Sequence, residues 1–366
     1  MRAAVFEPGR SSLVLDDVDI DEPGPRQVRV RVHYCSVCHS DYGVVMGGQG
    51  RGPTILGHEA AGVVDSVGPG VTSVSPGDKV VISPTAPCGH CQFCVADHPS
   101  LCVENGTSMY AWTFPDGSTG LSRRNEMVYR GMGTGGFADY VLAFDHAVVK
   151  VPAETPLDIA CVIGCAVQTG VGAALNTAAV RPGSTVLVLG LGGVGLCIVQ
   201  GARAAGATQI IGCDLLRDRR ETALAVGATH VIDPTAQDVV AVTKTLTASG
   251  VDYAFDAAGL AQLGEIGLDA IRPGGTMVLV GVPAADDALT LQPVSAFLIA
   301  EKTLTGCLMG GSNPQRDIPR YVAMWQSGML DLESLVTERR PFEEINEAFV
   351  DLGNGVGVRT ALALVD

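Results

Sequence analysis

The sequence lacks a surplus of basic residues. Its 24 lysines and arginines are outnumbered by 39 aspartates and glutamates, so the formal net charge at pH 7 is -15. Proteins that bind nucleic acid need a basic surface, because the phosphates repel a negative one. The composition therefore argues against nucleic acid as a partner.

The sequence also lacks the hydrophobic segments that place a chain in or across a membrane. Met1–Gly9 has no long apolar core of the kind found in signal peptides. The uncharged run Ile159–Val180 is interrupted by Gln168 and Thr169, which favours a buried helix over a membrane span. Eleven cysteines without a signal sequence indicate a reducing compartment in which thiolates bind metal. We expect a cytoplasmic protein with no membrane partner.

No internal repeat or low-complexity segment is present, and 366 residues at 47% hydrophobic content suffice for two cores. The first part reads as short strands, of which Gln27–His33 alternates strictly between apolar and polar residues. From Thr185 the pattern changes to continuous apolar runs separated by helices. This alternation predicts a doubly wound parallel sheet in the second half.

Four cysteines form the most specific pattern in the chain, C-x2-C-x2-C-x7-C at Cys88, Cys91, Cys94 and Cys102. Zn²⁺ accepts four thiolates tetrahedrally, and such a closed site is structural. Disulfides would need an oxidising compartment. A bacterial iron–sulfur run places its fourth cysteine after three residues and before a proline. The pattern therefore favours a structural zinc.

A second cluster combines Cys38–Asp41 with Gly57–Glu59. A thiol, an imidazole and nearby carboxylates are the ligand types of a catalytic zinc, with a carboxylate free to orient a ligand. Taken alone, either histidine of this cluster is more often a structural residue than a ligand.

The apolar run Val186–Leu189 leads into Gly190-Leu-Gly192-Gly-Val-Gly195 and a helix. This G-x-G-x-x-G pattern in a strand–turn–helix setting is typical of a dinucleotide-binding fold. The next strand, Gln209–Cys213, ends at Asp214, 24 residues after Gly190. An acidic residue there binds the ribose hydroxyls and repels a 2′-phosphate, which favours NAD over NADP. The alternative is a glycine-rich turn without nucleotide.

Taken together, these residues resemble the zinc-dependent alcohol dehydrogenases of the medium-chain dehydrogenase/reductase superfamily, over essentially the whole chain. The resemblance implies a GroES-like, mostly-β catalytic domain and a Rossmann coenzyme domain. The expected boundaries are residues 1–166 for the catalytic domain, with the zinc lobe at 88–102, then 167–305 for the NAD-binding domain. Residues 306–366 are expected to return to the catalytic domain.

The resemblance also implies roles for single residues. Cys38, His58 and Cys165 match the ligands of the catalytic zinc, with Glu59 as a carboxylate that can approach the metal. Asp41 matches the partner of the histidine ligand, and Ser40 the hydroxyl that contacts the substrate oxygen. The cysteines of the lobe match the family's second, structural zinc. The expected coenzyme-binding residues are His39, Thr169, Gly190, Gly192, Gly193, Val194, Gly195, Asp214, Arg219, Val280, Val282 and Arg359.

Two positions depart from well-studied relatives. A histidine that continues the proton relay is replaced by Gly43, which leaves the route beyond Ser40 open. The arginine by which the glutathione-dependent branch binds its adduct is replaced by Gly106. The long lobe resembles that of the dimeric branch, so we expect a homodimer in which a late strand such as Thr276–Val280 pairs across a two-fold axis.

The substrate wall matches Pro84, Gly131 and Met132, completed by Thr107 and Val282. Proline and glycine where relatives have large side chains predict a wide channel and a preference for bulky primary, aromatic or allylic alcohols over ethanol. One alternative is a biosynthetic aldehyde reductase of the same family. Another is a non-catalytic NAD-binding redox sensor, which would be expected to have lost a zinc ligand.

Overall fold

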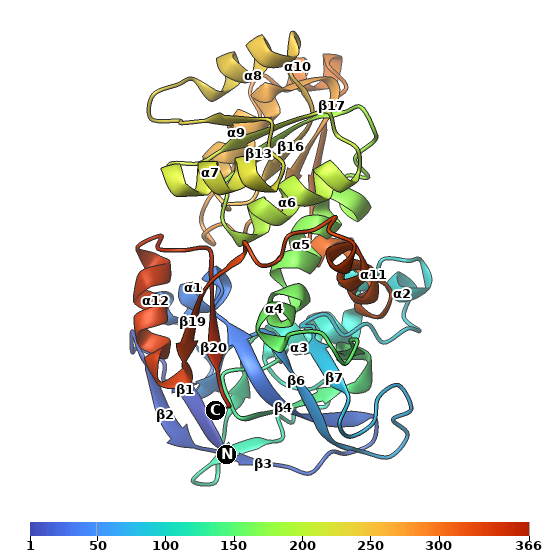
Figure 1. Cartoon of the computed structure of the whole chain (residues 1–366), viewed down its shortest axis with the longest axis vertical. Coiled ribbons are helices and arrows are strands. Elements are labelled where there is room, and N and C mark those ends of the chain that lie inside the picture. The colour runs from blue at the N-terminus through green and yellow to red at the C-terminus, as the bar shows by residue number, and fades with distance from the viewer. Residues whose placement is uncertain (49, 366) are drawn as a thin grey trace. The chain divides into compact units, whose positions relative to one another are not determined.

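The computed structural model describes residues 1–48 and 50–365, which form two compact units (Figure 1). Unit 1 consists of Met1–Cys165, Asn313–Ala323 and Leu335–Asp366, and unit 2 of Ala166–Ser312 and Met324–Ser334. Unit 1 is therefore assembled from both ends of the chain. Each unit has its own hydrophobic core.

Unit 1 is mostly β structure. Its strands are β1 (Arg2–Phe6), β2 (Leu13–Asp17), β3 (Asp19–Ile20), β4 (Gln27–Ser36), β5 (Thr54–Ile55), β6 (Glu59–Val67), β7 (Lys79–Ile82), β8 (Leu121–Arg123), β9 (Glu126–Met127), β10 (Tyr129–Arg130), β11 (Tyr140–Phe144), β12 (Val148–Lys150), β19 (Val336–Pro341) and β20 (Arg359–Ala363). Its helices are α1 (His39–Gly47), α2 (Gln92–Val95), α3 (Val103–Ala111), α4 (Leu157–Ala160) and α12 (Ile345–Gly353), while α11 (Pro314–Gln326) contributes to both units.

The largest sheet of unit 1 is organised around β4. Its order is β12-β7-β6-β4-β20-β19, and β11 also pairs with β4. Val28, Val30 and Val32 of β4 are fully buried, as the alternation of the sequence predicts. Antiparallel pairing places Ser36 of β4 opposite Glu59 of β6. The segments that follow β4 and precede β6 are thereby held close together, and both carry candidate ligands.

The expected helix Ile159–Val180 is interrupted. It consists of α4, a 3-10 turn at Cys161–Gly164, helix α5 (Ala166–Gly172) and a π turn at Ala173–Thr177. Cys165 lies at the break with non-helical backbone angles, φ -132° and ψ -71°. In the described part of the chain, no single helix is long and apolar enough to cross a membrane. Leu157–Gly164 and Ala166–Thr177 meet that criterion only as a bent pair.

Unit 2 contains the expected doubly wound sheet. Its parallel strands are β13 (Thr185–Leu189), β14 (Gln209–Cys213), β15 (His230–Ile232), β16 (Val251–Asp256), β17 (Ile271–Leu279) and β18 (Thr303–Gly306), in the order β15-β14-β13-β16-β17-β18. Its helices besides α5 are α6 (Gly193–Ala204), α7 (Arg217–Val226), α8 (Val239–Thr247), α9 (Ala261–Ala270) and α10 (Val294–Ile299). The strand order reverses at β13, and ligands of such sheets bind at the carboxyl ends of the strands there.

The strand expected to pair across a two-fold axis lies inside the sheet. Thr276–Leu279 belongs to β17, which pairs with β16 on one side and β18 on the other. A strand bonded on both edges has no free backbone groups for a second chain, so the expectation for Thr276–Val280 is wrong. The outer position next to β17 is taken by β18.

Candidate active site

Four side chains that can bind a metal converge in unit 1. Cys38, His58, Glu59 and Cys165 are buried, and their ligand atoms all lie within 4.8 Å of one another. Cys38 is the N-cap of α1, Glu59 is the first residue of β6, and His58 directly precedes it. Cys165 lies at the break before α5. Residues separated by up to 127 positions in the sequence thus form one cluster.

The turn before His58 requires glycine. Gly57 has φ +88°, and a Cβ at this position would lie 2.7 Å from the backbone nitrogen of Phe137. The Gly57 N–H donates to Asp41 Oδ1 at 3.0 Å. The backbone of this turn is therefore fixed by the same carboxylate that lies beside the His58 ring.

Asp41 is fully buried and its Oδ2 lies 3.0 Å from His58 Nδ1. The two atoms are not aligned as a hydrogen bond, although the distance is that of an ion pair. A carboxylate at Nδ1 leaves the other ring nitrogen for a metal, and such partners orient histidine ligands in metal sites. Asp41 thus lies where the sequence analysis expects a partner of the histidine ligand.

The electrostatics of the cluster favour a thiolate. The Cys165 thiol, followed by His58 and Arg359, lowers the pKa of Cys38 well below its ordinary value. Burial works against a charged His58 ring, but Asp41 and Cys38 more than offset it and raise the pKa of His58. Since the thiolate is the metal-binding form of cysteine, the cluster is suited to a cation.

Glu59 is the carboxylate of the cluster, and its charge is only partly compensated. Burial raises the pKa of Glu59 to about 7, against the opposing effect of Arg359. Arg359 is 4% exposed, and its Nε donates to Glu59 at 3.3 and 3.2 Å from the two oxygens. The buried Arg359 is therefore placed beside Glu59, whereas the sequence analysis expects it at a coenzyme phosphate.

The donor set fits Zn²⁺. Two sulfurs and one imidazole nitrogen are a known ligand set for catalytic zinc, which keeps a further position open. Cys38, His58 and Cys165 supply these three donors.

The four cysteines of the lobe also lie together. Cys88, Cys91, Cys94 and Cys102 have ligand atoms within 4.8 Å of one another, and all eleven cysteines are free of disulfides. Backbone N–H groups of Cys94 and Val103 lower the pKa of Cys91 to about 6. A closed set of four sulfurs fits a structural zinc.

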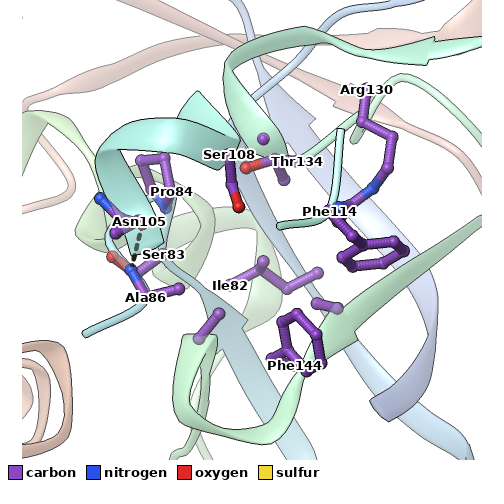
Figure 2. A pocket seen from close by; sticks show the side chains of 13 residues that line it. Ile82, Ser83, Pro84, Ala86, Asn105, Ser108, Phe114, Arg130, Thr134 and Phe144 are labelled. Carbon is purple, nitrogen blue, oxygen red and sulfur yellow. Dashed lines mark hydrogen bonds between the residues drawn. The ribbon is translucent and has the colours of Figure 1, made fainter. Parts of the chain in front are cut away.

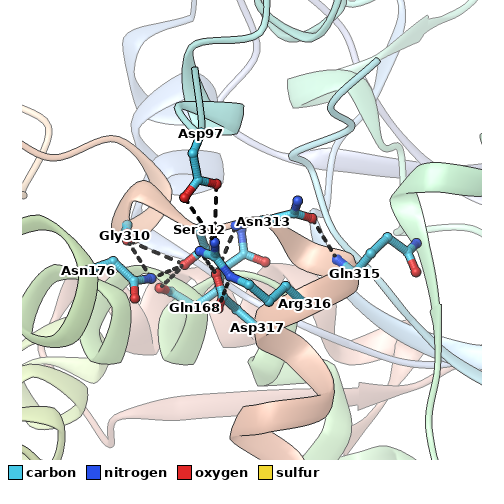
Figure 3. A network of polar contacts seen from close by, with 9 residues as sticks. All are labelled: Asp97, Gln168, Asn176, Gly310, Ser312, Asn313, Gln315, Arg316 and Asp317. Atoms are coloured by element: carbon cyan, nitrogen blue, oxygen red, sulfur yellow. Dashed lines mark hydrogen bonds and ion pairs between the residues drawn. The ribbon is translucent and has the colours of Figure 1, made fainter. Parts of the chain in front are cut away.

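The lobe is tied to the first turn of α11 (Figure 3). Arg316 Nη1 donates to Asp97 Oδ1 at 3.2 Å, and its Nε donates to Asp317 Oδ1 at 3.0 Å. Asp317 is fully buried and accepts from the Asn313 N–H at 2.9 Å. Arg316 therefore connects the lobe to the carboxylate that caps this helix.

The first turn of α1 carries the other residues expected near the substrate. His39 is exposed, Ser40 is half-buried and Asp41 is buried. Because α1 begins directly after Cys38, Ser40 lies two residues from a candidate zinc ligand. The first turn of α1 therefore keeps the Ser40 hydroxyl near Cys38.

The glycine-rich turn of unit 2 has the form a dinucleotide requires. Gly190 has φ +88°, and a Cβ there would lie 2.9 Å from Ala258 Cβ; at Gly195 it would lie 1.9 Å from the Gly190 carbonyl oxygen. Gly192 is the N-cap of α6, and a Cβ there would meet only Arg219 Nη1, at 3.9 Å. The open space beside Gly192, at a helix N-terminus that attracts anions, is suited to a pyrophosphate. Gly193 and Val194 form the first turn of the same helix.

Asp214 follows β14 directly and uses both oxygens within the protein. Oδ2 accepts from the Leu191 N–H at 2.7 Å and Oδ1 from the Leu216 N–H at 2.9 Å. Arg219 Nη1 lies 4.0 Å from Oδ2. Since a carboxylate has about four acceptor positions, capacity for ribose hydroxyls remains. Asp214 therefore stabilises the glycine-rich turn through the Leu191 N–H, in addition to its expected contact with the ribose.

The remaining coenzyme candidates of unit 2 differ in exposure. Thr169 is 8% exposed, Val280 is also 8% exposed, and Val282 is 81% exposed. Thr169 Oγ1 donates to Met309 Sδ at 3.7 Å. Helix α5, which carries Thr169, is hydrogen-bonded to the segment around Ser312. Ser312 Oγ donates to the Gln168 carbonyl at 3.3 Å (Figure 3).

The residues expected to form the substrate wall lie in different surroundings, and only some of them border a cavity. Pro84 lines a cavity (Figure 2), whereas Thr107 is exposed and donates to the Val103 carbonyl at 3.0 Å. Met132 has a left-handed backbone, φ 52°. A Cβ at Gly131 would lie 2.5 Å from Leu56 Cδ2. Leu56 thus occupies the space next to Gly131, and this glycine does not by itself widen a channel.

The same cavity is lined by residues that the sequence analysis did not select, among them Phe114, Arg130 and Thr134. Arg130 directly precedes Gly131, in a stretch rich in glycine and apolar residues. An arginine among glycines and apolar residues could have indicated from the sequence that its charge is buried. Its neighbours come from other segments of the chain, so the cavity itself has no pattern in the sequence.

Comparison with known proteins gives two family matches and several full-length relatives. Residues 24–153 match the alcohol dehydrogenase GroES-like domain, and residues 193–327 match the zinc-binding dehydrogenase family. S-(hydroxymethyl)glutathione dehydrogenase of Saccharomyces cerevisiae is 37% identical over 98% of this chain and 95% of its own length.

Two solved structures are similar over the whole chain. An alcohol dehydrogenase zinc-binding domain protein from Burkholderia ambifaria has a TM-score of 0.94 at 36% identity, and covers 100% of this chain and 99% of its own. Benzyl alcohol dehydrogenase from Acinetobacter calcoaceticus has a TM-score of 0.94 at 31% identity, with the same coverage.

Proposed function

The chain belongs to the zinc-dependent medium-chain alcohol dehydrogenases, and from this premise we propose that it oxidises a bulky primary or aromatic alcohol to the aldehyde with NAD, and catalyses the reverse reduction. The observation that carries this proposal is the convergence of Cys38, His58 and Cys165 in one buried cluster. The same chain carries a glycine-rich turn at a helix N-terminus.

In the proposed mechanism, Cys38, His58 and Cys165 would hold the catalytic ion, and Asp41 keeps the His58 ring in place. A zinc ion bound there supplies the Lewis acidity that lowers the pKa of a substrate hydroxyl. Asp41 Oδ2 lies 3.0 Å from His58 Nδ1, so it would orient the ring and make it a better ligand for a cation. Glu59 and Arg359 form a buried pair beside the cluster, and the pair balances the local charge.

Ser40 Oγ is proposed to accept the hydroxyl proton of the alcohol and pass it outward. NAD bound in unit 2 would supply the hydride acceptor for the carbinol carbon, so each turnover would convert the alcohol and NAD to the aldehyde, NADH and one proton. Ser40 is half-buried and the neighbouring His39 is exposed, which supports a route from the hydroxyl to solvent along the first turn of α1. Gly43 has no group that could take part.

NAD is proposed to bind unit 2 with its pyrophosphate beside Gly192 and its adenosine ribose at Asp214. The carboxylate of Asp214 is 9% exposed and would repel a 2′-phosphate. Arg219, next to both Gly192 and Asp214, supplies a positive charge for the bound coenzyme. Thr169, Val280 and Val282 are proposed to contact the nicotinamide half.

Two relatives support different substrates. The Acinetobacter calcoaceticus relative is named for benzyl alcohol, and the Saccharomyces cerevisiae relative for S-(hydroxymethyl)glutathione. Gly106 stands where the glutathione-dependent branch has an arginine, and it has no side chain to bind the adduct. We therefore place this protein with the aromatic and bulky primary alcohols.

A homodimer through unit 2 is part of the proposal. Helix α10, which precedes β18, exposes Val294 (64%), Leu298 (71%) and Ile299 (78%). Apolar side chains beside a sheet edge are suited to a second copy of the same chain, because pairing also satisfies the backbone groups of β18. Leu298→Asp should give a monomer in light scattering, and an unchanged dimer mass would contradict this interface.

All described cysteines are free, which supports a reducing compartment such as the cytoplasm.

Metal analysis and kinetics of three proteins test the catalytic proposal. The unmodified protein should hold two zinc ions per chain and reduce NAD with benzyl alcohol far more efficiently than with ethanol. Cys165→Ala should lose one zinc and all turnover but still bind NAD. Cys161→Ala is the matched control, because Cys161 is buried four residues away and donates to Asp158 O at 3.2 Å. Full activity in Cys165→Ala, or efficient oxidation of S-(hydroxymethyl)glutathione but not of benzyl alcohol, would overturn the corresponding part of the proposal.

A further inference from the structure

A small cavity within unit 1 lies apart from the metal cluster (Figure 2). It offers about 30 Å³ to the centres of water-sized molecules, which is room for roughly two waters. Its apolar walls include Ile82, Phe114 and Phe144, and its polar groups include Thr134 and Arg130. None of the four side chains of the candidate catalytic centre lines it. Pro84 of the expected substrate wall also lines the cavity, but the proposed mechanism assigns no step to the groups in it.

Arg130 brings an uncompensated positive charge to this cavity. Its side chain is 3% exposed, and no carboxylate among the described residues lies within ion-pair distance. Its Nη2 donates to the Leu142 carbonyl at 2.6 Å, and its guanidinium lies 3.8 Å from the centre of the Phe114 ring. Burial lowers the pKa of Arg130 to about 9, so the group still carries its charge at pH 7. A buried charge without a counter-ion costs several kcal/mol.

Thr134 is a second, independent sign that the cavity has an occupant. The residue is 2% exposed, and its Oγ1 is buried with no hydrogen-bond partner. Buried hydroxyls in native proteins are almost always bonded. Figure 2 places Thr134 and Ser108 on one side of the cavity and Phe114 with Arg130 on the other. A ligand between them can accept hydrogen bonds from both sides.

A larger cavity adjoins the first one and leads to the surface. The two share Ala86, Asn105, Ser108 and Phe144 in their linings. The outer cavity offers about 270 Å³ by the same measure, and its exposed rim includes His90 and Glu104. The two cavities therefore meet at these four residues, and the outer one lies between the inner cavity and the surface.

The charged groups of the outer cavity are already paired. Arg26 Nε lies 2.8 Å from Asp145 Oδ2, and His90 Nε2 lies 3.0 Å from Glu104 Oε1. Among the described residues along the two cavities, Arg130 is therefore the charge without a counter-ion. An anionic group is drawn to the inner cavity, and the rest of the molecule is left in the outer one.

We infer that these joined cavities form a binding site for a small organic carboxylate, separate from the catalytic centre. Its carboxyl group lies between Arg130 and Thr134 Oγ1, and its apolar body extends past Phe144 to the outer cavity. A carboxylate matches the two-water size of the inner cavity and the planar donor fork of a guanidinium. A phosphate dianion fits less well, since one arginine neutralises only one of its charges.

Calorimetric titration of the zinc-loaded protein with acetate, butyrate and benzoate tests the inference. Saturable binding is expected, with butyrate and benzoate tighter than acetate because their bodies reach the outer cavity. Arg130→Met should weaken binding by about tenfold or more, and Thr134→Val by a smaller factor, because each removes a donor to a charged group. Arg123→Met is the matched control: Arg123 is a partly buried arginine already paired with Glu7 and Asp16, and its loss should leave the affinity unchanged.

Carboxylates also coordinate zinc, so the titration is repeated on Cys165→Ala, where binding should persist. Absence of saturable binding in the unmodified protein would overturn the inference. Binding that survives Arg130→Met but is lost in Cys165→Ala would place the anion at the metal centre and overturn it as well. If Arg130→Met does not fold, Thr134→Val decides the matter, and an unchanged affinity in that variant refutes the site.

Discussion

Replacing Asp214 by Asn separates the two tasks of this carboxylate. Asp214 accepts from the Leu191 N–H at 2.7 Å and from the Leu216 N–H at 2.9 Å, one with each oxygen. Asn has a single acceptor oxygen, so one of these two amides loses its partner. An unpaired buried donor costs about 1–3 kcal/mol, and the melting temperature should fall by about 2–4 °C for each kcal/mol.

The effect on coenzyme choice follows from the lost charge. Two unit charges about 4 Å apart repel each other by about 4 kcal/mol at the effective dielectric of a protein surface. Removing the Asp214 charge also frees Arg219, which lies 4.0 Å from Oδ2, to bind a 2′-phosphate. Since each 1.4 kcal/mol is tenfold, the ratio of kcat/KM for NADP to that for NAD should rise by about two to three orders of magnitude.

The assay measures kcat/KM with both coenzymes at saturating benzyl alcohol, together with the melting temperature. Asp218→Asn is the control, because Asp218 is an exposed acid on the first turn of α7 and its loss changes the net charge equally. Equal kcat/KM for NADP and NAD in the unmodified protein would refute the role of Asp214 in coenzyme choice. An unchanged coenzyme ratio in Asp214→Asn would refute it as well.

Three further predictions address single contacts. Cys94→Ser should remove the zinc of the lobe and lower the melting temperature while the second zinc remains, and a protein that keeps two zinc ions would contradict the assignment. Asp41→Asn should lower zinc affinity or kcat about 10–100-fold by loosening His58, and unchanged values would show that the contact has no such role. Gly57→Ala should destabilise the protein by more than about 1 kcal/mol, because its Cβ would lie 2.7 Å from Phe137 N. Equal denaturation midpoints would refute this.

The sequence predicted best the elements whose pattern is purely local. The expected strand Gln209–Cys213 has the same bounds as β14, and the apolar run Val186–Leu189 lies within β13. Each is a mostly apolar run next to turn residues, and its burial requires no knowledge of distant partners. The glycine-rich turn could be predicted for the same reason.

What could not be predicted depends on contacts between distant segments. The break at Cys165 accompanies the close approach of Gly164 to β7, where a Cβ would lie 2.3 Å from the Ile82 carbonyl oxygen. Helix α3 was not expected, because Asn105 and Gly106 are weak helix formers. The wide channel at Gly131 was inferred from side-chain size alone, and Leu56 fills that space.

The pairing of β4 with β20 has a consequence for how the protein is made. These strands, blue and red in Figure 1, lie side by side, with Ser36 opposite Ala361. A ribosome that adds about 5–20 residues per second needs roughly 15–65 s to travel from one to the other. During that time Tyr34–Ser36 of β4 lack their β20 partner, while unit 2, nearly continuous in sequence, can already fold. The candidate zinc ligands have all been made once Cys165 is added, but Arg359, which donates to Glu59, is made only with β20. The cluster is therefore expected to gain the charge partner of Glu59 only at the end of synthesis.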